Sequence, residues 1–504
     1  MRAISRIRET LSERPETVLW LVGLYYVAAV TLRVLRIDGL QNDEAEQLVQ
    51  SQYLLFGYGR QPPLYNWLQY GLVQILGPSI LALSLLKNGL LFLTCLFYGL
   101  AARSVLKDKA LAASAMLGVL TIPAISVLAQ RDLSHAVATM CSIAFFLYAF
   151  MRTLKAPSLC GYALTGAAIG IGAITKYNFV VLPLAAWLAV FAEPTLRKHL
   201  FDRRIALTVL IALIICLPHA VWIAENFKTA TSGTIAVMRE DSTHNGILDR
   251  FHGLLMIVTS TVDGGSPLFA FFFFAFRGDL KSSWRACQPL ARVLFLTFVF
   301  SLVIIAIIAV SLRATTVTQK WLSPFLLLLP LYLCLKLESA GKSGLPGMLR
   351  LSVPVFILAF GFILYLTAAN LIGPSLGSRP KDNVPSIPFV RQVLDARGDR
   401  PMPAFILADG RSLAGSARIA ARTTPVFTPS FPQAPAPDAD LWKQGGLIIW
   451  QDGNPDDVPV PLIESLARAG IAAGTLKPET ATLPYIHSSD RHSASFGYAW
   501  LTPQ

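Results

Sequence analysis

The chain has 504 residues, of which 54% are hydrophobic and only 14% are charged. Soluble globular proteins carry about 25% charged residues, so this composition excludes an ordinary soluble enzyme and predicts a membrane protein. The formal net charge of +13 could indicate nucleic-acid binding, but the short cytoplasmic loops of membrane proteins produce the same basic excess. We therefore expect a membrane partner and no nucleic acid.

Long apolar runs recur from the first, TVLWLVGLYYVAAVTL, to about residue 372. A transmembrane helix needs about 20 mostly apolar residues, so these runs predict about eleven spans. Four arginines, Arg2, Arg6, Arg8 and Arg14, precede the first run, which resembles an uncleaved signal anchor. The predicted spans lie near residues 17–34, 79–102, 109–129, 133–151, 159–175, 177–192, 205–224, 265–276, 291–312, 320–337 and 349–372. The 265–276 run is short and could extend backwards.

The connections between these spans alternate in charge. One set is short and basic, and the positive-inside rule places it in the cytoplasm together with the N-terminus. The other set lies outside and comprises the loop 33–78, the segment 225–264 and everything after residue 372. The sequence thus predicts a multi-pass inner-membrane protein whose long polar segments all lie at the periplasmic face.

The first outer loop carries adjacent carboxylates, Asp43 and Glu44, with Glu46 close behind. One interpretation is structural: Asp43 is the N-cap of a helix and Glu46 its capping-box partner. The other is chemical, because a carboxylate at the outer face could act as a general base for an acceptor hydroxyl or amine. The two roles can coexist.

A Gly-rich basic turn then leads through Arg60 and Gln61 to Pro62-Pro63 and an aromatic segment, LYNWLQY. The prolines suit the entry to a helix, and the aromatic residues suit the membrane interface. The guanidinium of Arg60 could pair with a phosphate oxygen or simply extend to lipid headgroups.

The region 373–504 differs in composition from the rest of the chain. The stretches AFILADG, GGLIIWQDG and SFGYAWLTP predict strands, and PLIESLARAG predicts an amphipathic helix with a glycine stop. The proline-rich FTPSFPQAPAPDAD predicts a loop. We expect a membrane domain over 1–372 and a small periplasmic α/β domain over 373–504. No nucleotide-binding fingerprint is present, and no cofactor is expected.

No cysteine or histidine spacing indicates a metal site. Asp43, Glu44 and Asp132 could together hold a divalent cation through their oxygen atoms, but nothing in their spacing demands it. We predict that no metal is used.

The order of these features resembles the GT-C glycosyltransferases, in particular the group of the protein O-mannosyltransferases and the lipid A aminoarabinose transferases. The resemblance rests on the Asp43-Glu44 pair after span one and the Gly-rich turn into Pro-Pro-Leu. Further along it includes Arg131-Asp132, Thr175-Lys176-Tyr177, Pro218-His219-Ala220-Val221-Trp222 with Asn226, and Lys320-Trp321 with Pro324. It covers about residues 15–335. Rhizobial-type galacturonosyltransferases belong to this group.

The resemblance implies an enzyme that takes a sugar from a polyprenyl-phosphate carrier and transfers it, with inversion, to an acceptor such as lipid A or lipopolysaccharide core at the periplasmic face. Its implied catalytic residues are Asp43, Asp132 and Glu44. Its implied donor-phosphate cations are Arg60, Lys176, Lys320 and Arg131, and its implied substrate-binding residues are Gln61, Tyr177, Trp222 and Asn226. Simpler roles stay open for some of these, such as an ion pair between Arg131 and Asp132.

Gln61 departs from the group, since the aminoarabinose transferases tend to carry a lysine there. The donor sugar is therefore undetermined. Two other classes stay open, a transporter or flippase for a lipid-linked sugar and a non-catalytic glycan-assembly protein.

Overall fold

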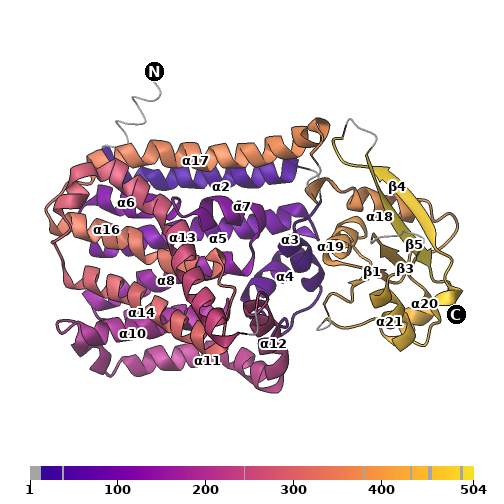
Figure 1. Ribbon diagram of the computed structural model, residues 1–504, viewed down its shortest axis with the longest axis horizontal. Helices are drawn as coiled ribbons and strands as arrows, with labels where there is room; N and C mark the ends of the chain where they lie inside the picture. Colours follow the sequence, from indigo (N-terminus) through magenta and orange to yellow (C-terminus); the bar gives the residue numbers. More distant parts are fainter. Residues whose placement is uncertain are drawn as a thin grey trace.

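The computed structural model describes residues 13–36, 39–242, 245–378, 381–431, 434–451, 457–488 and 492–503. The arginines Arg2, Arg6 and Arg8 of the predicted signal anchor lie outside these ranges. The described chain forms a bundle of long helices with a mixed α/β part at one end of it (Figure 1).

The bundle contains most of the helices of the molecule. They are α2 (Val18–Leu35), α5 (Ile80–Val105), α6 (Lys109–Val119), α7 (Ala129–Asp132), α8 (His135–Lys155), α9 (Leu159–Ala173), α10 (Val181–Ala192), α11 (Ile205–Glu225), α12 (Phe227–Met238), α13 (Gly246–Ser282), α14 (Pro289–Leu312), α15 (Gln319–Leu326), α16 (Leu328–Ser339) and α17 (Leu345–Ile372). Two shorter helices, α3 (Asn42–Gln50) and α4 (Leu64–Leu76), lie where the bundle meets the α/β part (Figure 1).

Within the described ranges, eight helices are long and apolar enough to cross a membrane, and a bent pair formed by Lys109–Val119 and Ala124–Asp132 would be a ninth. Two further apolar helices, Leu159–Ala173 and Tyr177–Ala192, are shorter. Many large apolar side chains on α11, α13 and α14 are exposed, as expected of surfaces that face lipid. The polytopic helical fold is confirmed, and the number of eleven spans stays a prediction.

The segment 225–264 was predicted to lie outside the membrane; it is largely helical, and its location stays a prediction. It contains α12 and the first half of α13, which continues through the apolar run 265–276 as far as Ser282 with one interruption at Arg277. The backward extension of the 265–276 run that the sequence allowed is therefore present, and it reaches Gly246.

The bend between α6 and α7 has a local cause. Pro123 comes directly before a single π-helical stretch, Ala124–Leu128, and the two helical pieces meet at 58°. π-Turns disturb the regular hydrogen-bond ladder and are frequent at functional sites. Here the turn brings the end of α7, and with it Asp132, towards α3.

The α/β part is built on one sheet with the strand order β2-β1-β3-β5-β4. The strands are β1 (Ile406–Ala408), β2 (Val426–Phe427), β3 (Leu447–Trp450), β4 (Glu479–Pro484) and β5 (Ser493–Trp500). β1 pairs in parallel with β2 and β3, whereas β5 is antiparallel to β3 and β4. The helices are α18 (Ser386–Asp395), α19 (Arg411–Ala420), α20 (Ala439–Gln444) and α21 (Val460–Arg468).

The three predicted strands and the predicted helix of this part are confirmed as β1, β3, β5 and α21. The sequence did not predict α18, α19, α20, β2 or β4. These elements are short: even the two amphipathic helices α18 and α19 have only 10 residues each.

Helix α3 lies between the two parts of the molecule. Its Ala45 and Leu48 share a buried apolar cluster with Leu83 of α5, Ile387 of α18 and Ile419 of α19. The polar first loop is therefore held from both sides, by the membrane bundle and by the α/β domain.

Candidate active site

The helix that carries the two predicted acids starts two positions earlier than the capping-box pattern indicated. Gln41, in an extended conformation, is the N-cap, and its backbone N–H donates to Oε2 of Glu44 at 3.3 Å. Glu44, and not Glu46, is therefore the residue at the third helical position. The prediction that Asp43 is the N-cap was wrong, because tertiary contacts decide where Glu44 points.

Those contacts are two buried ion pairs. Arg33 of α2 lies 2.7 Å from Oε2 of Glu44, and Lys87 of α5 lies 3.2 Å from Oε1. All three side chains are almost fully buried. Burial by itself would raise the pKa of Glu44, but the charges of Arg33 and Lys87 outweigh it and hold that pKa well below its usual range. Glu44 is thus a permanent anion whose oxygens are occupied by cations.

Asp43 points the other way, towards the bent α7 segment. Its backbone N–H donates to Oδ1 of Asp132 at 3.1 Å. The backbone N–H and the hydroxyl of Ser134 both donate to Oδ2 of Asp43 at 3.2 Å. Among the hydrogen bonds of the described residues, none uses Oδ1 of Asp43, so this oxygen is left to accept a proton from a substrate. The two carboxylates that the sequence placed on one face are confirmed as neighbours.

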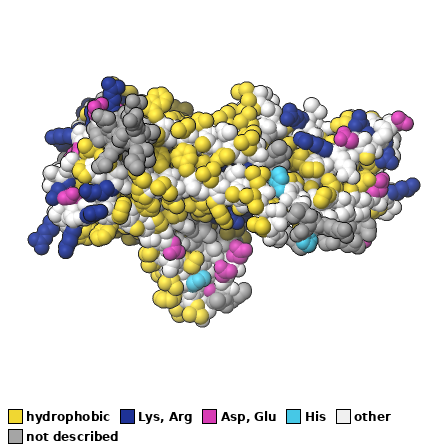
Figure 2. Space-filling model, turned by 90° about the horizontal axis from the view of Figure 1, so that it is seen from above, with side chains coloured by type: hydrophobic (Ala, Val, Ile, Leu, Met, Phe, Trp, Pro, Cys, Tyr) yellow, Lys and Arg dark blue, Asp and Glu magenta, His cyan; other side chains and the backbone are white. Residues whose placement is uncertain are grey.

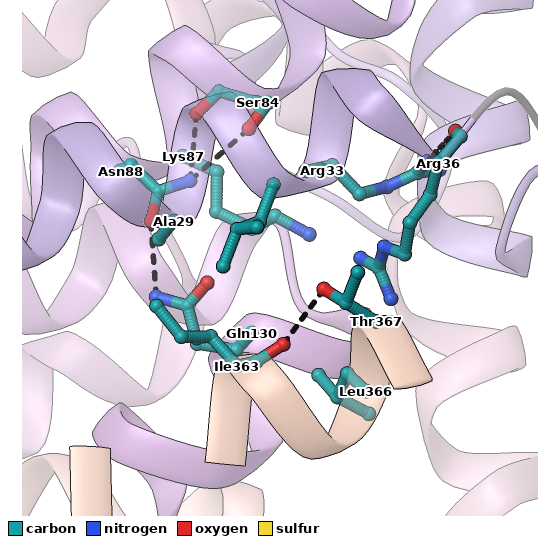
Figure 3. Close-up of a pocket in the computed structure, with 11 residues that line it drawn as sticks. Ala29, Arg33, Arg36, Ser84, Lys87, Asn88, Gln130, Ile363, Leu366 and Thr367 are labelled. Atoms are coloured by element: carbon teal, nitrogen blue, oxygen red, sulfur yellow. Dashed lines mark hydrogen bonds between the residues drawn. The ribbon is translucent and has the colours of Figure 1, made fainter. Parts of the chain in front are cut away.

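One pair of residues on α5 anchors both acid-bearing segments. Lys87 holds Glu44, which is next to Asp43, and the side chain of Asn88 accepts a 2.9 Å hydrogen bond from Gln130, two residues before Asp132. Figure 3 shows Lys87 and Asn88 on the same helix, with a dashed line from Asn88 to Gln130. They border a pocket of only about 10 Å³, which has room for about one water molecule. The anchors are therefore closely packed, and the positions of Asp43 and Asp132 depend on the same rigid helix.

Lys176 and Lys320 are brought together by two loops. The backbone N–H of Leu64, at the start of α4, donates to the carbonyl of Ile174 at 3.0 Å, and the side chain of Asn178 donates to the carbonyl of Trp321 at 3.0 Å. Burial is the largest cause that lowers the pKa of Lys176 to about 8, and the charge of Lys320 lowers it further, whereas the charge of Asp43 raises it. Lys176 therefore lies in the electrostatic field of both Lys320 and Asp43.

The remaining predicted cations have different surroundings. Arg131 is exposed, and no ion pair between described residues joins it to Asp132. Arg60 is exposed in a tight turn in which Tyr58 and Gln61 exchange backbone hydrogen bonds of 3.1 and 3.2 Å. Gly59 permits this turn, since its φ of 64° is one that other residues rarely adopt. Arg60 therefore projects from a rigid turn beside Gln61.

Tyr177 and Trp222 belong to one aromatic stack. The imidazole of His219 lies between them, with ring centroids 5.8 Å from Tyr177 and 5.7 Å from Trp222 and nearly parallel planes. Trp222 packs on Gly57 so closely that a Cβ at that glycine would lie 2.3 Å from the indole. Asn226 has a more local role, because its side chain donates to the carbonyl of Trp222 at 3.0 Å.

The sequence interpretation treated His219 as an ordinary satisfied polar group. Its Nδ1 lies 2.7 Å from the carbonyl oxygen of Phe56, which can only accept, so Nδ1 carries the proton. The buried Nε2 and the hydroxyl of Tyr177 have no partner among the described residues. Both atoms are available to a bound substrate.

Comparison with known proteins shows the family to which the chain belongs. A family model described as "Dolichyl-phosphate-mannose-protein mannosyltransferase" matches residues 60–222. The lipopolysaccharide core galacturonosyltransferase RgtA of Rhizobium johnstonii is 36% identical over 490 residues, which cover 96% of this chain and 97% of RgtA. RgtB of the same organism is 35% identical over 486 residues, which cover 95% and 96% of the two chains. The chain belongs to this family of glycosyltransferases.

Solved structures agree on the fold. ArnT from Cupriavidus metallidurans matches over 95% of this chain and 98% of its own, at 14% sequence identity, with TM-scores of 0.58 in the apo state and 0.57 bound to undecaprenyl phosphate. The resemblance to the GT-C group and the prediction of a membrane glycosyltransferase are confirmed. The transporter and assembly-protein alternatives receive no support.

Two buried charged residues beside the site of the transferase were missed by the sequence interpretation. Lys87 and Arg33 were not proposed, although a lysine within the apolar run of α5 is the kind of buried charge that usually has a function. Ser134 had no signal of its own, since serine before a helix normally indicates only a cap.

A metal site is the last feature to consider in the transferase. Within the described part of the chain, no three His, Cys, Asp or Glu side chains gather so that they could hold a metal ion. Metal-independent transfer stays a prediction.

Proposed function

We propose that the transferase moves a sugar from a polyprenyl-phosphate carrier to an acceptor of the lipopolysaccharide type. The names of its relatives RgtA and RgtB support the acceptor class, and the undecaprenyl phosphate bound to the similarly folded ArnT supports the donor class. The acceptor oxygen would form a bond with the anomeric carbon of the sugar, and the bond from that carbon to the carrier phosphate would break.

The observation that carries this proposal is the environment of Asp43. Two hydrogen bonds from Ser134 fix Oδ2, and Oδ1 is available. The proposed role of Asp43 is that of a general base, whose Oδ1 takes the proton of the acceptor hydroxyl as that oxygen attacks. Attack opposite the leaving phosphate inverts the anomeric configuration. Asp132 holds the backbone of Asp43 and adds negative charge beside the attacking hydroxyl.

The leaving phosphate needs positive charge. Lys176 and Lys320 are the proposed partners because Lys176 lies in the electrostatic field of both Lys320 and Asp43. For Arg60 and Arg131 the donor-phosphate role stays a prediction, as does substrate binding by Gln61, Tyr177, Trp222 and Asn226. Glu44, whose oxygens are occupied by Arg33 and Lys87, is assigned to holding α3 in place and not to proton transfer.

The proposed orientation places the basic connections in the cytoplasm and the α/β domain of residues 373–504 in the periplasm. Figure 2 supports it, since Lys and Arg side chains gather at the end of the helix bundle that is opposite the α/β domain. The proposed membrane domain spans residues 1–372 with eleven helices in the inner membrane. In this orientation Asp43 lies on the periplasmic side.

Replacement of Asp43 by Asn tests the proposed chemistry. The amide keeps the shape and can still accept from Ser134, but it cannot take a proton. We expect the rate of sugar transfer by the purified enzyme to fall at least about 100-fold, because general bases contribute about 10² to 10⁴ in rate. The assay supplies a polyprenyl-phosphate sugar and lipopolysaccharide core, and mass spectrometry detects the product.

The matched control is Asp395→Asn, at an exposed carboxylate on α18. It should transfer sugar at the wild-type rate. Wild-type transfer by Asp43→Asn, with thermal unfolding unchanged in both variants, would disprove the role of Asp43. A deletion strain whose lipopolysaccharide has an unchanged mass would contradict the proposed acceptor.

A further inference from the structure

A second polar site lies where the α/β domain meets the bundle. It is a cleft of about 410 Å³, which is within the range of pockets that bind small ligands. Its wall is made by α3, the turn before α4, α12, and the start of α19 with the loop after β2. No single element forms the cleft, and it exists only because the α/β domain docks on the bundle.

The charges of the cleft are unbalanced. Arg60, Lys228 and Arg411 line it, and Glu46 is the one acidic residue among the described residues of the lining. Glu46 and Arg411 form a pair at 3.2 Å, with the guanidinium of Arg411 over the ring of Phe431. Arg60 and Lys228 form no ion pair with any described residue. Two positive charges are therefore left facing the cleft, together with the lining hydroxyl residues Ser232 and Ser430.

The cleft is close to the proposed base. Asp43, Glu46 and Gln50 follow the i, i+3, i+7 spacing that places residues on one face of a helix. Glu46 and Gln50 line the cleft, and Asp43 is one helical turn before Glu46, a rise of about 4.5 Å. The face of α3 that carries Asp43 therefore continues into the wall of the cleft.

We infer that this cleft binds an acidic group, a carboxylate or a phosphate, of the glycan acceptor and so selects an acidic oligosaccharide for transfer. The inference rests on the proposed function. Arginine and lysine side chains are the usual partners of carboxylates and phosphates. The acceptor is favoured over the donor because the cleft opens against Arg411 and Ser430 of the α/β domain, whereas Lys176 and Lys320 lie among the bundle helices that a lipid-linked donor would reach.

Lys228 is the residue with which to test it, because it lines the cleft and belongs to no other part of the site. The test measures equilibrium binding of core oligosaccharide, freed from lipid and with its acidic groups intact, to the full-length enzyme in nanodiscs. Lys228→Ala should weaken binding by about tenfold or more, the usual size of one hydrogen bond to a charged group. Lys228→Glu should weaken it further, and Lys228→Arg should bind as the wild type does.

Kinetic measurements show whether Lys228 acts on acceptor binding, on donor binding or on the chemical step. In Lys228→Ala the KM for the acceptor should rise by about the same factor, while kcat and the KM for the donor stay within twofold. Lys477→Ala, at an exposed lysine of the α/β domain outside the cleft, is the control and should change nothing. An oligosaccharide whose carboxylates are reduced and whose phosphates are removed should bind wild type and Lys228→Ala equally.

Three results would overturn the inference. The first is equal binding of the oligosaccharide by Lys228→Glu and the wild type, and the second is a rise in the donor KM alone. The third is an effect of Lys228→Ala that disappears when the anionic nanodisc lipids are replaced by zwitterionic ones. That result would assign the cleft to lipid headgroups. Because binding is measured without turnover, a wild-type enzyme that binds the oligosaccharide but transfers nothing contradicts the proposed function and leaves this inference supported.

Discussion

At the scale of single residues, the neighbours Asp43 and Glu44 show how environment separates two chemically similar groups. Glu44 is enclosed by Arg33 and Lys87, and removal of one member of such a buried pair usually costs about 3–5 kcal/mol. Asp43 is half-buried and holds only neutral donors from Ser134. A proton acceptor must have a free oxygen, and of these two residues Asp43 is the one that offers it.

Lys176 gives a prediction about pH. Burial and the charge of Lys320 lower the pKa of Lys176 to about 8, so Lys176 is charged below that pH and neutral above it, whereas an ordinary lysine stays charged to about pH 10. If Lys176 holds the donor phosphate, the KM for the donor should rise as the pH increases through about 8. Steady-state kinetics between pH 6.5 and about 9.5 would measure this.

Arginine at position 176 provides the control, since a guanidinium stays charged throughout this range. The Lys176→Arg variant should keep a low donor KM at alkaline pH, and the KM for the acceptor should follow the same pH course in both proteins. An identical alkaline rise in donor KM in wild type and variant would assign the effect to another group.

At the scale of elements, α3 depends on α19 of the α/β domain as much as on the membrane helices. Gly415 of α19 lies against Ala45 so closely that a Cβ at Gly415 would be 2.6 Å from the Cα of Ala45 and 2.7 Å from its Cβ. Both atoms belong to the rigid part of α3. The missing side chain at Gly415 therefore sets the distance between the domain and the helix that carries Asp43.

Gly415→Ala should separate α19 from α3. Overpacking of this kind costs about 1–3 kcal/mol, and the displacement of Asp43 should lower the rate of sugar transfer by more than tenfold. Gly474→Ala, where a Cβ meets nothing within 4 Å, should transfer sugar as the wild type does. Transfer assays and thermal unfolding of both variants check this, and an unchanged transfer rate in Gly415→Ala would show that α3 does not need this contact.

At the scale of the whole molecule, the positions of the basic connections and of the α/β domain predict the orientation of the protein in the membrane. Cys160 and Cys287 are exposed thiols beside the basic connections, and the α/β domain is at the other end of the bundle. A membrane-impermeant maleimide added to intact spheroplasts should leave both cysteines unmodified and should label a cysteine introduced by Lys477→Cys. After the membrane is permeabilised, all three should react. Labelling of Cys160 or Cys287 before permeabilisation would reverse the orientation.

Much of this molecule follows from local sequence. Apolar runs predicted the helical membrane bundle, because an apolar segment that crosses the bilayer must hydrogen-bond its own backbone N–H and C=O groups, as a helix does. Short apolar runs that end in turn residues predicted β1 and β3, and the stretch SFGYAWLTP predicted β5. The ordered polar motifs indicated the glycosyltransferase family and a second acid, Asp132, on the same face as Asp43.

Other features were decided only by the tertiary structure. The start of α3 differs from the capping-box pattern because Arg33 and Lys87, distant in sequence, draw Glu44 to themselves. The anchoring of Asp43 and Asp132 by Lys87 and Asn88 of α5, the stack around His219 and the basic cleft at Lys228 join segments that lie far apart in the chain. The sequence by itself determined which residue types were available at the membrane surface. Their partners were set by packing, because contact energies depend on distance in space and not on distance along the chain.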